Sequence, residues 1–396
     1  MKLYLIIYLW VATALCAQFH QLPKITTQGS EETPILKIRV ESSKKEVQLL
    51  AMQAFHVHGY YELVKNKADF VFKIELNQIG ADVSILSPIS GAIKRKAAVP
   101  SLGKSWMDTV LRACDQMVLL TSGKAGFFAG KLLSIGNKSG KNEVYRSDLF
   151  FQQVIQLTNH QSNTLGPSWA PDANSLLYTS YYKSGFPDIF KINLQNNQIK
   201  TFATYKGTNT GAAYSPDGKQ VAMILSSSGN PELYISDSNG DSLIRVTSNR
   251  TLESAPAWSP DGGRLVLSSN KPGKPQLFTV APRPKSHMSL IRTNVSSYCA
   301  EPDWNPRNPD LLVFTVAVRG GFQLAVYDFK SRKSEILTQG SVDSIEPNWL
   351  NDGRHIVFTR RDRLGKQLNI LDYESKKVVP LHSKKFGSFS QADFVY

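Results

Sequence analysis

Ala255-Pro256-Ala257-Trp258-Ser259-Pro260-Asp261-Gly262 is the clearest copy of a motif that recurs through the C-terminal two-thirds of the chain. In each copy, an aromatic residue is followed by a short turn that contains proline, aspartate or glycine. The aromatic residues of five copies lie 45, 44, 46 and 45 positions apart, at Trp169, Tyr214, Trp258, Trp304 and Trp349. A further step of 45 positions reaches Phe394, so a sixth aromatic residue keeps the same period.

The residues of one repeat predict four short strands. Proline presets φ in the turn, aspartate accepts backbone N–H groups, and glycine adopts positive φ. Apolar strands such as 176–179 and 189–192 follow, and the last strand of several repeats ends in threonine, as at Leu157-Thr158. Four strands in about 45 residues is the size of one propeller blade, and neighbouring blades must stack to bury both faces.

The end of the chain predicts how the repeats close. Residues 388–396 contain a strand with its own aromatic residue, but no further strands follow it. Three strands without an inner partner, 131–135, 143–147 and 153–157, precede the first full repeat. Joining the final strand to these three completes a sixth blade, whereas an open solenoid of five repeats would leave exposed edges. We therefore expect a six-bladed β-propeller over residues 125–396, closed by the C-terminal strand.

The preceding region, residues 18–124, lacks the repeat and predicts a small α/β domain with a flexible start. Strands are expected at 35–40, 70–76 and 82–86, and a helix at 45–59. A second helix is expected from Ser105, a capping residue, to Thr121, with Gly123 ending it. The fold class is thus multidomain, an N-terminal α/β domain followed by an all-β propeller.

The first residues have the layout of a secretory signal peptide. Lys2 precedes an uncharged run from Leu3 to Leu15, and small residues follow up to Ala17. This run is short for a membrane span, although a short membrane anchor is the alternative. Residues 1–17 are therefore predicted to be cleaved on export, and Cys16 leaves lipidation open. The other cysteines, Cys114 and Cys299, are expected to be buried and unpaired.

The formal net charge of +14 is consistent with attraction to an acidic partner, an anionic lipid or a polyanion, although a solvated basic surface is the favoured interpretation. Basic clusters lie at 94–96, 360–363, 376–377 and 384–385. Because the clusters are scattered and an exported chain seldom meets nucleic acid, nucleic-acid binding is not expected.

The mouth of the propeller is the candidate binding site. Residues just before each aromatic residue are expected there, because the loops at the strand ends of six blades converge on one opening. The residues predicted at this mouth are Glu253, Ser254, Thr210, Glu301, Glu346 and Gln391. They either contact a partner or cap strand ends. No cofactor is expected, with Ca²⁺ held by the carboxylates as an open alternative.

An enzymatic function is the less favoured hypothesis from the sequence. No G-x-S-x-G, H-E-x-x-H or supported S-x-x-K motif occurs. His56 and His58 lie two positions apart near the end of a predicted helix, so they do not share a helical face. Packing or surface roles are expected for both histidines, and no catalytic residue is predicted.

The chain resembles the bacterial TolB family. The resemblance rests on the export signal, on the junction Leu119-Leu120-Thr121-Ser122-Gly123 with Phe127-Phe128 beyond it, and on the repeat around Trp258. It covers about 350 residues. It implies a periplasmic scaffold of the Tol–Pal envelope system, peripheral to membranes through its partners. The implied partners are a Pal-like lipoprotein at the mouth and a TolA-like inner-membrane protein at the N-terminal segment, supporting outer-membrane integrity and cell division. The alternatives are a secreted polyanion- or carbohydrate-binding propeller and, less favoured, a propeller hydrolase.

Overall fold

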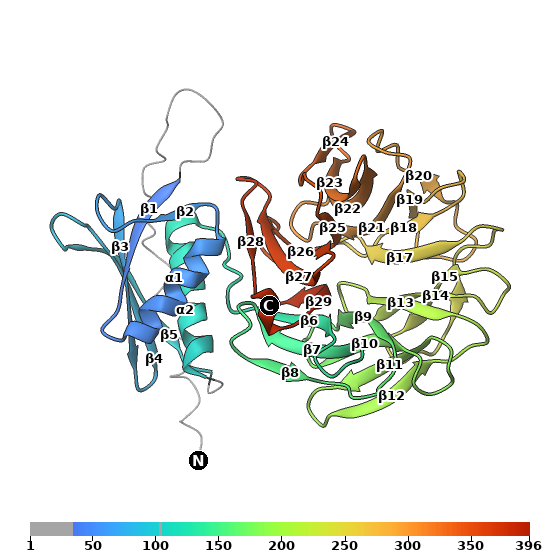
Figure 1. Cartoon of the computed structure of the whole chain (residues 1–396), viewed down its shortest axis with the longest axis horizontal. Helices are drawn as coiled ribbons and strands as arrows, with labels where there is room; N and C mark the ends of the chain where they lie inside the picture. The colour runs from blue at the N-terminus through green and yellow to red at the C-terminus, as the bar shows by residue number, and fades with distance from the viewer. Residues whose placement is uncertain (1–34, 103–104) are drawn as a thin grey trace, which may run out of the picture. The chain divides into compact units, whose positions relative to one another are not determined.

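The computed structural model describes residues 35–102 and 105–396. The predicted signal peptide (1–17), the predicted flexible segment (18–34) and Cys16 lie outside these described residues. Within them, an α/β domain precedes a ring of six four-stranded sheets (Figure 1). None of the described helices combines the length and the apolar character needed to cross a membrane.

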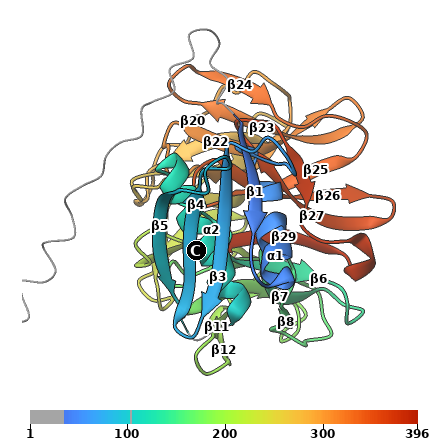
Figure 2. The ribbon, with the colours of Figure 1, turned by 90° about the vertical axis from the view of Figure 1, so that its left-hand side faces the viewer.

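The α/β domain contains one five-stranded sheet with the order β2-β1-β3-β4-β5. Its strands are β1 (Leu36–Glu41), β2 (Tyr61–Leu63), β3 (Phe70–Asn77), β4 (Gly80–Leu86) and β5 (Ile93–Pro100). Strand β1 runs parallel to both of its neighbours, whereas β3, β4 and β5 are antiparallel (Figure 2). The three predicted strands are confirmed. Strands β2 and β5 were not predicted, because β2 is very short and the first half of β5 is basic.

Two helices, α1 (Lys45–Val57) and α2 (Trp106–Ser122), complete this domain, as predicted. The Ser105 side chain accepts a hydrogen bond from the Asp108 backbone N–H at 3.1 Å and so caps α2. Gly123 ends the same helix at φ 71°, a left-handed conformation that glycine adopts without strain. Cys114 on α2 is buried and unpaired, as is Cys299 in the propeller, so both cysteine predictions are confirmed.

Each blade of the propeller is an antiparallel sheet of four strands. Blade 1 comprises β9 (Thr164–Trp169), β10 (Ser175–Ser180), β11 (Asp188–Asn193) and β12 (Gln198–Ala203), and blade 2 comprises β13 (Asn209–Tyr214), β14 (Gln220–Leu225), β15 (Glu232–Asp237) and β16 (Ile244–Arg245). Blade 3 comprises β17 (Glu253–Trp258), β18 (Leu265–Ser269), β19 (Gln276–Val280) and β20 (Ser289–Leu290). Blade 4 comprises β21 (Cys299–Trp304), β22 (Leu311–Val318), β23 (Gly321–Asp328) and β24 (Lys333–Ile336). Blade 5 comprises β25 (Asp343–Trp349), β26 (His355–Asp362), β27 (Gly365–Asp372) and β28 (Val378–Pro380).

Blade 6 joins the two ends of the repeat region, as the sequence predicted. Its strand order is β29 (Phe389–Val395), β6 (Lys131–Gly136), β7 (Glu143–Asp148) and β8 (Val154–Gln156). Strands β29 and β6 pair antiparallel, with Ser390 opposite Ile135 and Phe394 opposite Leu132. The inner strands β9, β13, β17, β21, β25 and β29 contact one another in turn, and β29 contacts β9. The ring is therefore closed by the C-terminal strand.

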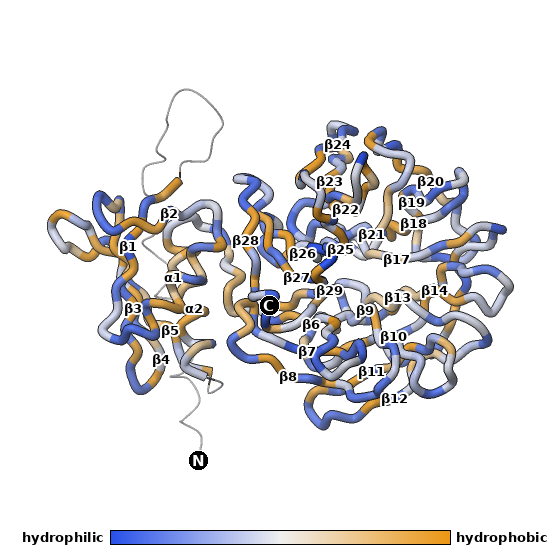
Figure 3. The backbone as a smooth tube through the Cα atoms, viewed as in Figure 1, coloured by the Kyte–Doolittle hydropathy of each residue, from blue (hydrophilic) through white to orange (hydrophobic). Residues whose placement is uncertain are grey.

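Buried apolar side chains fill each junction between blades. Six clusters are found within the described residues, one for each pair of neighbouring blades. Trp258, for example, packs with Ala222 and Leu233 of the preceding blade. Apolar stretches of the backbone lie within the blades, whereas many connecting loops are polar (Figure 3) and outer strands such as β24 are largely exposed. The repeated aromatic residues thus hold consecutive blades together by burying apolar surface.

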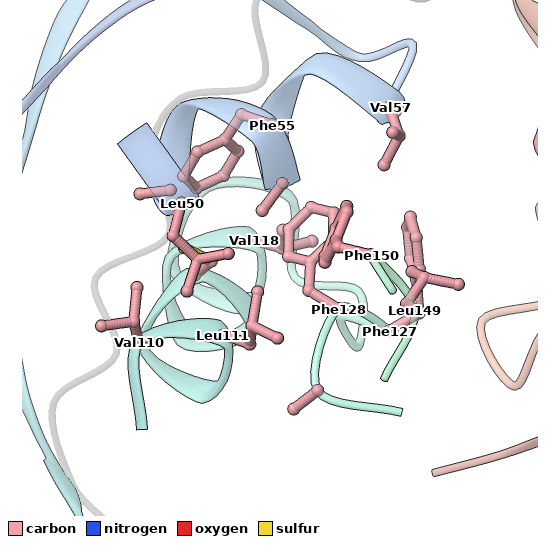
Figure 4. Packing of buried hydrophobic residues seen from close by; sticks show 14 of the residues in the cluster. Leu50, Phe55, Val57, Val110, Leu111, Val118, Phe127, Phe128, Leu149 and Phe150 are labelled. Carbon is pink, nitrogen blue, oxygen red and sulfur yellow. The ribbon is translucent and has the colours of Figure 1, made fainter. Parts of the chain in front are cut away.

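The cluster between blades 5 and 6 continues into the α/β domain. Phe55 on α1 packs against Phe128 in the segment between α2 and β6, with ring centroids 5.6 Å apart (Figure 4). The buried carboxylate of Asp115 on α2 accepts hydrogen bonds from the backbone of Phe128 and from the Tyr396 hydroxyl, at 2.7 and 2.9 Å. The predicted boundary at residues 124 and 125 falls in this segment, which is packed against both domains.

Candidate partner-binding site at the propeller mouth

The mouth is defined here as the end of the ring at which the six inner strands begin. Three positions before each repeated aromatic residue, the inner strand contains a residue with positive φ. These residues are Gly166, Gly211, Ala255, Glu301, Glu346 and Gln391, with φ between 49° and 64°. At each position the register with the next strand shifts by a bulge. A bulge re-aims side chains out of the regular ladder, and here it recurs in all six blades.

Glu301 links blade 4 to blade 5 through this bulge. Its Oε2 accepts the backbone N–H of Glu346, the equivalent residue one blade further on, at 2.9 Å. The same oxygen accepts the Thr315 hydroxyl at 2.7 Å. A carboxylate that bonds the backbone of the next blade stabilises the ring, because hydrogen bonds to charged groups are stronger than neutral ones.

Glu346 repeats this arrangement towards blade 6. Its Oε2 accepts the backbone N–H of Gln391 at 3.0 Å and the Thr359 hydroxyl at 2.8 Å. The Oε1 of Gln391 in turn accepts the backbone N–H of Gly166 in blade 1 at 2.9 Å. Three of the predicted residues therefore form a continuous series of bonds that spans blades 4, 5, 6 and 1, including the junction where the ring closes.

A second series of hydrogen bonds between blades lies two residues further along the inner strands, away from the mouth. In blades 4, 5 and 6, it uses the residue directly before the repeated aromatic residue. Asp303 accepts the Trp349 backbone N–H at 2.6 Å, and Asp393 accepts the Trp169 backbone N–H at 2.5 Å. Between them, Asn348 accepts the Phe394 backbone N–H at 3.1 Å. This second series was not predicted, although the polar residues Asp303, Asn348 and Asp393 share the 45-residue spacing.

Burial changes the protonation of these carboxyl groups. Burial and, to a smaller extent, the charge of Asp393 raise the pKa of Asp303 to about 7, although the hydrogen bond from the Trp349 backbone opposes the shift. Burial likewise raises the pKa of Asp393 to about 6. Burial and the neighbouring charge of Glu346 raise the pKa of Glu301. The buried carboxyl groups of Asp303 and Asp393 therefore lose their protons closer to neutral pH than a free aspartate does.

Thr210 and Ser254 lie one residue before the bulge of their strands, so they are at the mouth but outside the series of bonds. Thr210 is half-buried and Ser254 is exposed. In their blades, the equivalent of Glu301 is Gly211 or Ala255, and neither side chain can accept a hydrogen bond. The structure brings these two residues to the mouth without linking them to Glu301.

Glu253 differs from Glu301 and Glu346 in its hydrogen-bond partners. Its side chain is buried and accepts the Thr247 hydroxyl at 2.5 Å and the Asn249 amide at 2.5 Å. Burial, together with the adjacent Glu232 carboxylate, raises the pKa of Glu253 to about 7. A protonated Glu253 can donate to Glu232, whose Oε2 is otherwise buried without a partner. The geometry gives Glu253 a structural role inside the blade.

Within the described residues, one group of three side chains brings potential metal-ligating atoms within 4.8 Å of one another. It consists of His58, His355 and Asp372, all buried, between the α/β domain and blade 5. The Oδ2 of Asp372 already accepts the Gly59 backbone N–H at 2.8 Å and lies 2.8 Å from Nη2 of Arg354. Because a guanidinium and an amide occupy the oxygen a metal ion would use, the cluster is organised as an ion-pair network. His58 packs there, as predicted for a structural histidine.

Six four-stranded sheets in a closed ring, preceded by a small α/β domain, define the chain as a two-domain β-propeller protein whose mouth is held by hydrogen bonds between blades. A family model described as the TolB β-propeller domain matches residues 119–392, and the chain belongs to this family. The match begins near the end of α2 and ends within β29.

Two curated relatives match part of the chain. The TolB homolog of Chlorobaculum tepidum is 30% identical over 137 residues, which are 35% of this chain and 31% of that protein. The Tol-Pal system protein TolB of Desulfosudis oleivorans is 29% identical over 138 residues, again 35% of this chain and 31% of the relative. The matched region therefore spans about a third of the length of each relative.

The crystal structure of TolB from Acinetobacter baumannii superposes with a TM-score of 0.79. It covers 92% of this chain and 98% of that chain, at 17% identity. At this identity the likeness concerns the fold, and it includes both the α/β domain and the propeller because nearly the whole of each chain is aligned.

Proposed function

We propose that this chain is a periplasmic scaffold protein of the Tol–Pal envelope system. In this proposal, the propeller mouth binds a Pal-like peptidoglycan-associated lipoprotein, and the N-terminal segment binds a TolA-like inner-membrane protein. The protein is then peripheral to both membranes through its partners and supports outer-membrane integrity and cell division. It acts as a binding protein, with no enzymatic step.

The observation that carries the proposal is the series of bonds at the mouth. Glu301, Glu346 and Gln391 hold the inner strands of blades 4, 5 and 6 in register with one another. A mouth held in this way presents a pre-organised surface, which reduces the ordering cost of binding. Membership of the TolB propeller family and the names of the curated relatives support the choice of partner.

Binding to the Pal-like lipoprotein of the same organism tests the mouth. We expect the purified chain without residues 1–17 to bind the soluble domain of that lipoprotein in isothermal titration calorimetry. Changing Glu301 and Glu346 together to glutamine keeps an acceptor oxygen for each bond but removes both charges. We expect at least a tenfold change in affinity, because electrostatic complementarity contributes to such interfaces. Absence of any binding by the wild-type chain would refute the proposed partner.

The exposed acid Glu335 provides a matched control. It lies on the outer strand β24 of blade 4 and pairs with Lys376 at 2.8 Å. Glu335→Gln removes one negative charge away from the inner strands and is compared with Glu301→Gln alone, which removes one charge at the mouth; we expect Glu335→Gln to leave the affinity unchanged. An equal effect of Glu335→Gln would indicate general electrostatic attraction by the whole protein, without a site at the mouth.

The N-terminal segment is tested by deletion. A chain that begins at residue 35 should lose binding to the TolA-like protein and keep binding to the lipoprotein, because the described fold begins with β1 at Leu36. We propose no cofactor for either interaction. Calcium at the mouth is the alternative, since Glu301 and Glu346 offer the oxygen ligands that this ion takes, and titration with calcium chloride tests it.

A further inference from the structure

A cavity of about 360 Å³ opens between blades 5 and 6 at the mouth end of the ring. One wall is the hairpin that joins β26 to β27, including Arg361 and Lys366. The other wall is blade 6, with Ser388 and Ser390 at the start of β29 and Asn142 before β7. The cavity lies beside the start of β29, and about half of its lining is polar. It is large enough for a side chain of a bound partner.

Lys366 gives this cavity an uncompensated positive charge. The residue is half-buried, and its ammonium donates a long hydrogen bond to the Ser390 hydroxyl at 3.4 Å. Within the described residues it forms no ion pair. The two neighbouring charges are balanced instead: Arg361 pairs with Asp343 at 2.8 Å, and Asp362 pairs with Lys384. An ammonium with unused donors beside amides and hydroxyls is a receptor for one carboxylate.

The surroundings of the cavity are strongly basic. Two basic clusters of the sequence, 360–363 and 384–385, are brought together by the ion pair between Asp362 and Lys384. We call this surface the basic rim, and its cations are Arg360, Arg361, Arg363, Lys366, Lys384 and Lys385. The Nε of Arg360 is buried without a hydrogen-bond partner in the described structure. Arg363, Lys366 and Lys385 form no ion pair within the described residues, whereas Arg361 and Lys384 do, so part of the positive charge of the rim is available to an acidic ligand.

An exposed apolar residue at the rim distinguishes between kinds of acidic ligand. Leu364, at the tip of the same hairpin, is 85% exposed. In the short helical turn before β29, Phe386 is partly exposed, and the Lys138 ammonium lies over its ring at 4.0 Å. A sulfated or phosphorylated polymer gains nothing from an exposed leucine, whereas an acidic protein segment with apolar residues does.

We propose that the basic rim binds an acidic segment of a partner protein and that the cavity takes one carboxylate of that segment on Lys366. The segment crosses the hairpin so that an apolar side chain contacts Leu364. This inference rests on the proposed function, because each places a partner protein at the mouth. It adds the chemistry of the partner surface that contacts blades 5 and 6. The net charge of +14 favours the encounter.

The test uses a labelled peptide that combines glutamates with leucines, matched with a version in which glutamine replaces glutamate. Fluorescence anisotropy at low ionic strength should show binding of the glutamate peptide and no binding of the glutamine peptide. Lys366→Glu should weaken it about tenfold or more, because it reverses a charge in the cavity. Leu364→Ser should weaken it about threefold, an effect of losing one apolar contact.

Lys330 provides the matched control. It is exposed in the turn after β23, at the opposite end of the ring from the mouth. Lys330→Glu makes the same change in net charge and should leave the affinity close to that of the wild type. Lys385→Glu, on the exposed part of the rim, serves as a second test that does not depend on the cavity remaining folded, and it should weaken binding.

Three results would overturn the inference. One is equal affinity of the Lys366→Glu and Lys330→Glu variants for the peptide. Another is equal binding of the glutamate and glutamine peptides. The third is a heparin fragment that displaces the peptide while its own binding ignores Leu364→Ser, since this would identify a polyanion site. Because no lipoprotein is used, failure of the lipoprotein titration leaves this test intact, and the reverse also holds.

Discussion

The backbone N–H of Glu346 donates a hydrogen bond of 2.9 Å to the carboxylate of Glu301, so a side chain in blade 4 holds the inner strand of blade 5. Both residues have positive φ, and they occupy the same position in successive repeats. The carboxylate of Glu346 then makes the same bond to Gln391 in blade 6. The residues that shape the mouth are therefore also the residues that join the blades next to the closing strand.

Loss of the Glu346 carboxylate should destabilise the propeller. Glu346→Ala removes acceptors for the Gln391 N–H and the Thr359 hydroxyl, and we expect the free energy of unfolding to fall by about 2 kcal/mol. Glu346→Gln keeps an acceptor oxygen and should cost less than half of that. Urea unfolding followed by tryptophan fluorescence measures both variants. Equal stability of the alanine and glutamine variants would show that the bonds carry little energy.

The left-handed backbone at Glu346 makes a separate prediction about glycine. At φ 55°, residues with a Cβ are strained by roughly 1 kcal/mol, a cost that glycine avoids. Glu346→Gly should therefore be more stable than Glu346→Ala, although both lose the same hydrogen bonds. At Ala213, a position of β13 without positive φ, the order should be reversed, with Ala213→Gly less stable than wild type. Equilibrium unfolding of the three variants decides the matter.

Asp372 is the central acid of the contact between the α/β domain and blade 5. Burial by itself raises its pKa, but His355 and Arg354 outweigh burial and hold the pKa well below its usual range. Asp372→Asn leaves the guanidinium of Arg354 with a weaker partner and should cost about 3 kcal/mol. Asp241→Asn, the same change at an exposed site, should stay within about 0.5 kcal/mol. Differential scanning calorimetry compares the two, and similar melting temperatures would contradict the proposed network.

His355 predicts how the stability of this contact depends on pH. Burial lowers the pKa of His355, but the Asp352 charge and hydrogen bond, together with Asp372, raise it to about 8. Because the folded-state pKa is above the unfolded one, the stabilisation is complete below pH 6.5 and is lost as the pH rises through about 8. The loss amounts to about 2 kcal/mol.

Other buried groups also titrate in this pH range; burial raises the pKa of Asp115, for example, to about 7. Comparing wild type with His355→Gln isolates the contribution of His355. The difference in unfolding free energy between wild type and His355→Gln should shrink as the pH is raised from 6 to 9. A difference that stays constant over this range would mean that His355 is neutral throughout.

The repeat spacing of aromatic residues predicted the number of blades and the closing strand, because the period and the missing strands are both visible in the sequence. Trp349 and Phe394 lie one blade apart, as the spacing requires. The cap at Ser105 and the stop at Gly123 were predictable for a similar reason, since local chemistry determines both.

The partners of the polar side chains were not predictable to the same degree. Glu253 and Glu301 look alike in the sequence, yet a difference of two positions along the inner strand places one inside a blade and the other at the bulge. Asp372 and Gly59 are 313 positions apart, and no local pattern indicates that they bond. The basic rim likewise depends on Asp362 and Lys384 meeting in space.

The most direct measurement of the central claim is a cross-link between the C-terminal strand and β6. Ser390 and Ile135 are opposite one another in that ladder. With Cys114 and Cys299 changed to serine in a chain without residues 1–17, the pair Ser390→Cys and Ile135→Cys should form a disulfide on mild oxidation and raise the melting temperature. The pair Ser390→Cys and Ser331→Cys, on different blades, should not. Failure of the first pair to cross-link in folded protein would contradict a ring closed by β29.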